Sequence, residues 1–236
     1  MTYNEYTAKY ELDCSQITGQ ASIDMSGFYG AVKFIGSDQD DMFISGGGGR
    51  VAANNNANPV EIHGGKGADT IDLTASGMPP SGQDMRYCTL TYARGDSEYN
   101  NYDSVSGFQT DKKSGDALYL PTKVVFGDVA SGQSTGIDNV TYGAKDGIIT
   151  FTGKASLEQL IEAALSDNII GDATSTAAFE YRGDTYVIQG DGVAGAGTND
   201  LVIKLVGVTG VTAFGSTAAD NTIVLTDHVL GVFTGS

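Results

Sequence analysis

Apolar residues in the first third of the chain occur in short runs, separated by turns rich in Gly, Asp, Asn and Ser. The runs lie at 22–25, 32–35, 42–44, 60–62 and 70–73. Runs this short match β-strands, because an amphipathic helix needs apolar positions at a 3.6-residue period over about ten residues. A series of such strands joined by tight Gly/Asp turns is typical of a parallel β-helix or β-roll.

The turn before the last of these strands carries the most specific motif. Residues 64–72 read G-G-K-G-A-D-T-I-D and match the nonapeptide G-G-x-G-x-D-x-U-x at every fixed position, where U is apolar. A degenerate copy at 36–44 keeps the first Gly, the Asp at position six and the apolar residue at position eight. Residues 45–49 could begin a third copy that has lost its Asp. The region resembles the RTX (repeats-in-toxin, hemolysin-type) calcium-binding nonapeptides of bacterial proteins exported by type I secretion.

This resemblance implies that the Gly/Asp turns bind Ca²⁺, and the chemistry of the residues agrees with it. Glycine permits left-handed turns that leave carbonyl oxygens pointing inward, and the Asp at position six supplies a hard anionic oxygen. Calcium takes about six to eight oxygen ligands. The candidate ligands in the two copies are Gly36, Asp38, Asp40, Asp41, Gly64, Gly65, Gly67, Asp69 and Asp72.

The spacing of the two copies leaves their arrangement open. Asp41 and Asp69 are 28 residues apart, whereas adjacent turns on one edge of an ideal nonapeptide roll are about 18 residues apart. The segment 49–59 is therefore either an insertion in the opposite turn or an extra degenerate strand. In the first case Asp41 and Asp69 share an ion; in the second they lie on opposite edges.

Composition and charge favour a cation as partner. The chain has 236 residues, 29 Asp and Glu against 13 Lys and Arg, and a formal net charge of −16. Nucleic acid and anionic membranes need a basic surface, so neither is expected as a partner. No apolar run reaches about 18 residues, so we expect no membrane insertion. The first residues lack the features of a classical signal peptide.

Two cysteines, Cys14 and Cys88, allow at most one disulfide and indicate neither a disulfide scaffold nor a zinc site. The composition favours free or buried thiols. A bridge between the two would close a long loop and would stabilise the fold if the geometry allowed it.

The segment 87–120 is similar to the stretch that closes many RTX rolls. It contains a strand at 87–92, a polar loop and a second strand at 115–120. Asp96, Asp103 and Asp116 are candidate ligands for a further calcium ion there. Solvated turn aspartates are the alternative interpretation of each.

The second half of the chain is β-rich with one helix. A helix is predicted at about 156–166, because Ser156 and Gln159 form a capping box and apolar residues recur on one face. A hairpin is predicted at 178–188 with Gly183-Asp184 at the turn, and a buried strand at 201–206. The end of the chain, 211–236, resembles the uncleaved export signals of type I substrates. A final strand that pairs with the cap is the compatible structural alternative.

Catalytic motifs in the sequence are weak. Residues 132–136 match the nucleophile elbow G-x-S-x-G around Ser134, but no helix is expected to follow. Residues 190–195 match G-x-G-x-x-G, yet a strand follows; Asp191 and Asp200 in this loop are weak ligand candidates. His63 is isolated, and the tripeptide Arg94-Gly95-Asp96 is better explained by a buried or calcium-bound Asp96. We therefore expect no enzyme.

The sequence predicts a mostly all-β protein, a parallel β-roll or β-helix with a β-rich C-terminal cap containing one helix. Residues 1–120 would form the calcium-binding roll, and 121–236 the cap with the export signal. The implied function is a calcium-folded C-terminal module of a secreted, extracellular protein, acting in cell-surface assembly or anchoring, as in surface-layer proteins and adhesins. Its partners would be calcium, the type I secretion apparatus, and either a second copy or a cell-surface polysaccharide. The alternative is a secretion-and-folding tail of an RTX enzyme or toxin.

Overall fold

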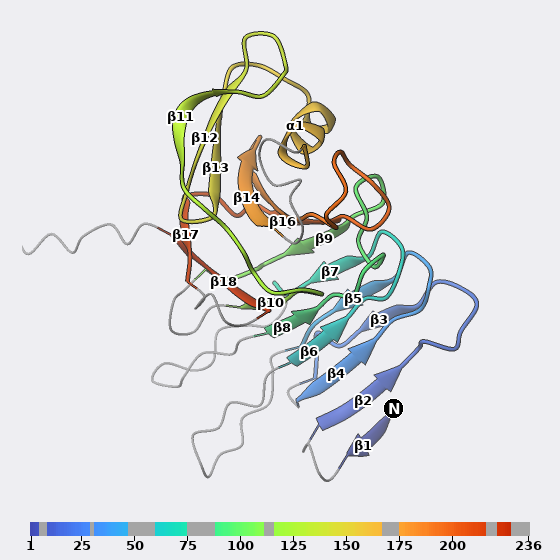
Figure 1. Ribbon diagram of the computed structural model, residues 1–236. Coiled ribbons are helices and arrows are strands. Elements are labelled where there is room, and N and C mark those ends of the chain that lie inside the picture. The colour runs from blue at the N-terminus through green and yellow to red at the C-terminus, as the bar shows by residue number, and fades with distance from the viewer. Residues whose placement is uncertain are drawn as a thin grey trace, which may run out of the picture.

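Figure 1 shows the computed structural model of the chain. The structure describes residues 1–4, 9–28, 31–46, 60–74, 88–110, 116–166, 175–215 and 221–227. Within these residues the protein is strand-rich with a single α-helix, so the prediction of a mostly β protein is confirmed. Two mixed sheets contain all the strands.

The first sheet has eight strands, and its middle part is parallel. In spatial order its strands are β1 (Thr2–Asn4), β2 (Lys9–Asp13), β4 (Val32–Ile35), β6 (Val60–His63), β8 (Cys88–Thr91), β10 (Ala117–Tyr119), β18 (Thr222–Asp227) and β17 (Val211–Phe214). The antiparallel strands β1, β18 and β17 flank the parallel part.

The second sheet has ten strands and combines an antiparallel half with a parallel half. Its order is β11 (Val129–Ser134), β12 (Thr141–Lys145), β13 (Ile148–Thr152), β14 (Thr176–Tyr181), β15 (Asp184–Gln189), β16 (Leu201–Val206), β9 (Asp103–Ser106), β7 (Thr70–Asp72), β5 (Met42–Ile44) and β3 (Ser22–Asp24). The strands from β16 to β3 are parallel.

Between β2 and β10 the chain alternates from one sheet to the other, so that each strand pairs with the strand two positions before or after it in the chain. We call one strand of each sheet, with the turn that joins them, a rung. The register places Met42 opposite Thr70 and Phe34 opposite Ile62. The turns 36–41 and 64–69 are therefore successive turns on the same edge. The turns 14–21 and 92–102 lie on this edge too, and we call it the glycine/aspartate edge. In Figure 1 it is the side on which coloured loops join β4 to β5 and β6 to β7.

This register decides between the two arrangements that the sequence left open. Strand β5 ends and β6 begins at the opposite edge, and the turns of Asp41 and Asp69 lie on the same edge, as in the first alternative. The residues to which that alternative assigns the insertion are among 47–59. They lie outside the described residues, as do the last three residues of the third copy predicted at 45–49.

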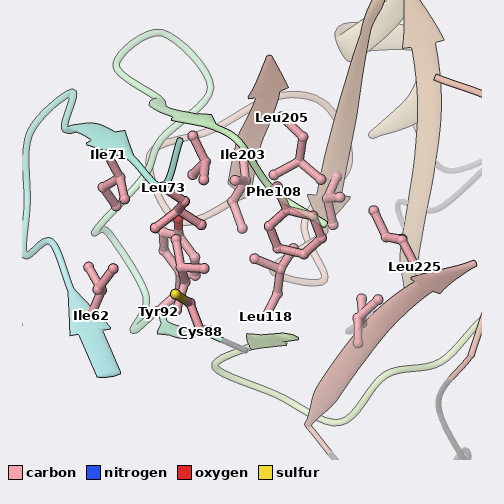
Figure 2. Packing of buried hydrophobic residues seen from close by; sticks show 14 of the residues in the cluster. Ile62, Ile71, Leu73, Cys88, Tyr92, Phe108, Leu118, Ile203, Leu205 and Leu225 are labelled. Carbon is pink, nitrogen blue, oxygen red and sulfur yellow. The ribbon is translucent and has the colours of Figure 1, made fainter. Parts of the chain in front are cut away.

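The core lies between the parallel parts of the two sheets. Strands β4, β6 and β8 alternate buried and half-buried residues, as a strand with one face on a core should. Figure 2 shows side chains from both sheets, among them Ile62 and Ile71, pointing toward one another. The rings of Phe34 and Phe43 stack across this space with centroids 4.5 Å apart.

The helix covers the other face of the second sheet. Helix α1 (Leu157–Ala164) begins at the capping box predicted from Ser156 and Gln159, and Ile161 and Leu165 pack in a second apolar cluster with β14–β16. Strand β16 therefore has apolar residues buried on both faces, Val202 toward the helix and Ile203 toward the core between the sheets. This explains its continuous apolar sequence.

Two predictions about the second half need correction in detail. The hairpin turn consists of Arg182 and Gly183, which both have positive φ, and Asp184 is already paired with Tyr181 as the first residue of β15. A left-handed pair suits the tight turn between strongly twisted strands. The final strand, β18, pairs with β10 as well as with β17, so it joins the first half of the chain.

Neither Cys88, which is buried, nor Cys14, which is half-buried, forms a disulfide. Among the described residues, no helix has the length and apolar character needed to cross a membrane.

The substitution Gly36→Ala tests the close approach of the turns. Gly36 lies outside the left-handed region, but an added Cβ would meet the carbonyl oxygen of Gly64 at 1.7 Å. We expect a loss of about 2–3 kcal/mol in the free energy of unfolding, measured by urea denaturation. The control Gly19→Ala, with nothing within 4 Å of its new Cβ, should change stability by less than about 1 kcal/mol. Equal stability of the two variants would contradict the packing of these turns.

Candidate functional site

The two nonapeptide turns stack directly on each other, and their glycines make this possible. Gly65 and Gly67 have φ of 98° and 116°. A Cβ on Gly65 would lie 1.9 Å from the carbonyl oxygen of Ser37, and one on Gly67 would lie 2.6 Å from the carbonyl carbon of Gln39. Backbone carbonyls of turn 36–41 therefore face the backbone of turn 64–69 without intervening side chains, as an oxygen-lined cation site requires.

Two exposed contacts link the outer parts of the same turns. The Nζ of Lys66 lies 3.2 Å from Oδ2 of Asp38, and the backbone N–H of Ala68 donates to Oδ1 of Asp40 at 2.9 Å. The candidate ligands Asp38 and Asp40 therefore hold one turn in register with the next, each 28 residues from its partner.

The position-six aspartates Asp41 and Asp69 are buried and joined with Asp103 in a chain that we call the aspartate ladder. The N–H of Asp41 donates to Oδ1 of Asp69 at 2.7 Å, and the N–H of Asp69 donates to Oδ1 of Asp103 at 2.9 Å. At the first rung the N–H of Ala21 donates to Oδ1 of Asp41 at 2.6 Å. Each carboxylate thus binds the backbone of the preceding rung.

The ladder ends at a serine that connects it to the second half of the protein. The N–H of Asp103 donates to Oγ of Ser97 at 2.8 Å, and that hydroxyl donates to the carbonyl oxygen of Val202 in β16. Arg94, in the same turn, donates to the carbonyl oxygens of Gly190 and Asn199 at 3.0 and 2.9 Å. The turn 92–102 is therefore fastened to β16 and the loop before it.

The Oδ2 atoms of the three ladder aspartates differ in their surroundings. Oδ2 of Asp41 accepts the N–H of Ser37. Oδ2 of Asp69, Oδ2 of Asp103 and the hydroxyl of Tyr92 are buried without a hydrogen bond of good geometry. The Tyr92 hydroxyl nevertheless lies beside the Asp103 carboxyl, where its interaction opposes the rise in the pKa of Asp103. Buried polar atoms are nearly always partnered, so these carboxylate oxygens need a proton or a cation.

Further ionisable groups surround these two carboxylates. Nε2 of His63 lies 2.9 Å from Oδ2 of Asp96, which also accepts the N–H of Ala93 at 2.6 Å. Asp96 is 6% exposed, which rules out the interpretation of Arg94-Gly95-Asp96 as an exposed recognition tripeptide. By the register of β6 and β8, Tyr92 takes the place that Gly64 has one rung earlier.

Burial and mutual repulsion perturb the ionisation of the ladder. Burial raises the pKa of Asp69 to about 7, against the opposing effect of the hydrogen bond from Asp41. Burial and then the negative charge of Asp69 raise the pKa of Asp103 well above its usual range. The hydrogen bond to Asp96 raises the pKa of His63. The buried carboxylates of the ladder thus have little positive charge near them.

The remaining predicted ligands lie elsewhere. Asp72 accepts the N–H of Thr74 at 2.7 Å in a local turn. Asp116 accepts the N–H groups of Cys88 and Gln109, at the end of β8 opposite to Asp96. The structure therefore does not bring Asp116 together with Asp96 and Asp103: Asp116 closes the turn on the other edge.

Asp200, a weak candidate in the loop 191–200, has a structural role. Its two carboxylate oxygens accept the N–H groups of Asp191 and Gly197 at 2.8 and 2.7 Å. Ser134 is an exposed residue of β11 and is followed by a turn and another strand, so the nucleophile-elbow motif lacks its helix.

No cluster of three His, Cys, Asp or Glu side chains in the described part of the chain is arranged to hold a metal ion by itself. A cation at the ladder would therefore take most of its oxygens from backbone carbonyls or water. Sequence analysis identified Asp41, Asp69 and Asp103 but missed His63, Tyr92 and Ser97. A register of 28 residues, if known, would have placed Tyr92 over Gly64.

No model of a known protein family matches the chain, and a comparison with curated proteins finds no match either.

Metal-free protein should lose stability as the pH rises. Asp69 has a folded pKa of about 7, above the ordinary value of about 3.9. The resulting stability is fully present below about pH 4 and is lost as the pH rises to about 7. The raised pKa of His63 acts in the same direction. Urea denaturation in chelator should show higher stability at pH 5 than at pH 8.

Asp69→Asn should flatten this pH dependence, because the amide stays neutral and keeps an oxygen for the N–H of Asp41. Asp38→Asn removes the same charge from an exposed site and should leave the slope as in the wild type. An unchanged slope in Asp69→Asn would show that this carboxyl does not carry the effect.

Proposed function

We propose that the chain is a calcium-binding module whose Gly/Asp turns complete their folding when a cation neutralises the aspartate ladder. In this proposal the parallel strands between β2 and β10 act as a short β-roll of the RTX kind. The observation that carries it is the pair of buried carboxylate oxygens on successive rungs, Oδ2 of Asp69 and Oδ2 of Asp103, which accept no hydrogen bond from a backbone N–H.

The available ligands favour calcium. The turns offer carboxylate and carbonyl oxygens, which suit a hard cation with about six to eight oxygen ligands and flexible geometry. Asp69 and Asp103 would supply the anionic oxygens. A Cβ on Gly65 would collide with the carbonyl oxygen of Ser37, and a Cβ on Gly36 with that of Gly64. These carbonyl oxygens therefore already lie close to the neighbouring turn. His63 is engaged with Asp96.

Charge supports the same conclusion on a larger scale. The formal net charge is −16, and the ladder places three carboxylates in the interior, 0–2% exposed. Each divalent ion removes two units of the excess charge. Unpaired buried charge is costly, so a bound cation stabilises the folded state over the unfolded one.

More than one ion is needed for a folding switch. Sites of extracellular modules have dissociation constants of about 10⁻⁴ to 10⁻³ M. One site at a tenfold excess of calcium adds only about 1.4 kcal/mol to the free energy of unfolding. The unpartnered oxygens occur on two successive rungs, which gives room for cooperative sites along the edge.

Calcium should raise the melting temperature of the wild type in millimolar concentration relative to chelator. In Asp69→Asn we expect this shift to fall to less than half, while the variant in chelator at pH 8 is at least as stable as the wild type, because no charge is buried at that position. Differential scanning calorimetry measures both. Asp38→Asn should retain the full shift. Equal melting of the wild type in calcium and chelator would overturn the proposal.

The proposed setting is outside the cell, after type I export, where calcium is millimolar. The Thr-, Gly-, Ala- and Val-rich sequence and the absence of a helix after Ser134 support a non-catalytic role in surface assembly or anchoring. Electron microscopy and light scattering after addition of calcium test this role. Sheets or rods are expected, whereas a persistent monomer would favour a secretion-and-folding tail.

A further inference from the structure

A pocket of about 390 Å³ lies between the turn 92–102 and the beginning of α1, away from the aspartate ladder's unpartnered oxygens. One wall carries Tyr99, Asn100 and Tyr102, and the other carries Leu157, Glu158 and Ile161. Nothing in the proposed calcium-dependent folding uses these side chains. The volume is at the small end for ligand sites, so the ligand would be one or two rings in size.

The first wall exists because the turn 92–102 is longer than the preceding turns. Asp69 and Asp103 are 34 residues apart, against 28 between Asp41 and Asp69, and the added residues project toward α1. Glu98 and Asn101 exchange backbone hydrogen bonds of 3.3 and 3.1 Å. The tip, with Tyr99 and Asn100, is thus a closed and well-defined turn.

The second wall is also fixed. Ser156 and Gln159 form a complete capping box, which sets the direction of the first turn of α1. Ile161 is 1% exposed and anchors the helix on the second sheet. On the other side, the ring of Tyr102 packs edge-on against Tyr186, with centroids 6.0 Å apart. Both walls are held by the core, so the pocket is formed before a ligand arrives.

We propose that this pocket binds a neutral pyranose sugar. The rings of Tyr99 and Tyr102 and the aliphatic side chain of Leu157 provide an apolar surface for the C–H faces of a sugar ring, with the buried Ile161 behind it. Asn100 and Glu158 supply an amide and a carboxylate for its hydroxyl groups. A carboxylate at the pocket, in a chain of net charge −16, repels acidic sugars.

An organic ammonium ion is the competing ligand. Recognition of quaternary ammonium groups uses a cage of several aromatic faces around the cation, whereas two tyrosines line this pocket and the opposite wall is aliphatic. The number of hydrogen-bonding groups relative to aromatic rings therefore favours the sugar.

The test uses the full chain in millimolar calcium and saturation-transfer NMR with cellotriose, chitotriose and mannotriose. Binding of at least one of these neutral trisaccharides is expected. Tyr99→Ala and Glu158→Gln should each weaken that binding about tenfold or more. Tyr119→Ala, on β10 outside the pocket and 45% exposed, should bind as the wild type does.

Two further probes define the outcomes. Trigalacturonate tests charge, and choline tests the ammonium alternative. The inference is overturned if none of the three neutral sugars binds, if choline binds in their place, or if Tyr99→Ala and Tyr119→Ala bind alike. Far-ultraviolet circular dichroism of each variant shows that loss of binding is not loss of fold. Sugar binding is measured in millimolar calcium on protein whose fold is checked by circular dichroism. A failure to bind sugar can therefore be told apart from a failure of calcium to drive folding.

Discussion

The hydrogen bond from a backbone N–H to the aspartate of the next rung is the interaction on which the first half of this protein depends. At this edge the chain leaves one strand and turns into the other sheet, so the N–H before each strand needs a partner. Asp41, Asp69 and Asp103 provide it along three rungs, and Ser97 continues the chain of hydrogen bonds into β16. The same atoms that align the strands also bury negative charge.

This double role is the physical basis of the proposed cation site. Removing the carboxylates would leave backbone donors unpaired, and keeping them leaves Oδ2 of Asp69 and of Asp103 without a partner. A proton resolves the conflict at low pH, since burial holds the pKa of Asp69 near 7. In the proposed function a metal ion resolves it at higher pH. The ladder is thus a structural device that becomes sensitive to its ionic surroundings because it is buried.

Sequence reasoning located the parts of the site that depend on local chemistry. The nonapeptide at 64–72 fixed the positions of the glycines and of Asp69, and the capping box fixed the start of α1. It could not find His63 with Asp96, 33 residues apart, or Tyr92 above Gly64, because both follow from the register. That register depends on the length of the opposite turn, which no local pattern specifies. The local sequence pattern likewise gave no reason to place Asp116 on the other edge.

The turn 92–102 shows how one irregular segment can combine several roles. Its residues Tyr92 and Asp96 line the buried carboxylates, Arg94 and Ser97 bind the second half of the protein, and Tyr99 lies in the pocket beside α1. Asp103 is the first residue of β9 and Tyr102 immediately precedes it; Asp103 lies in the ladder, whereas Tyr102 lines the pocket. Order at the ladder and the shape of the pocket therefore depend on the same few backbone bonds.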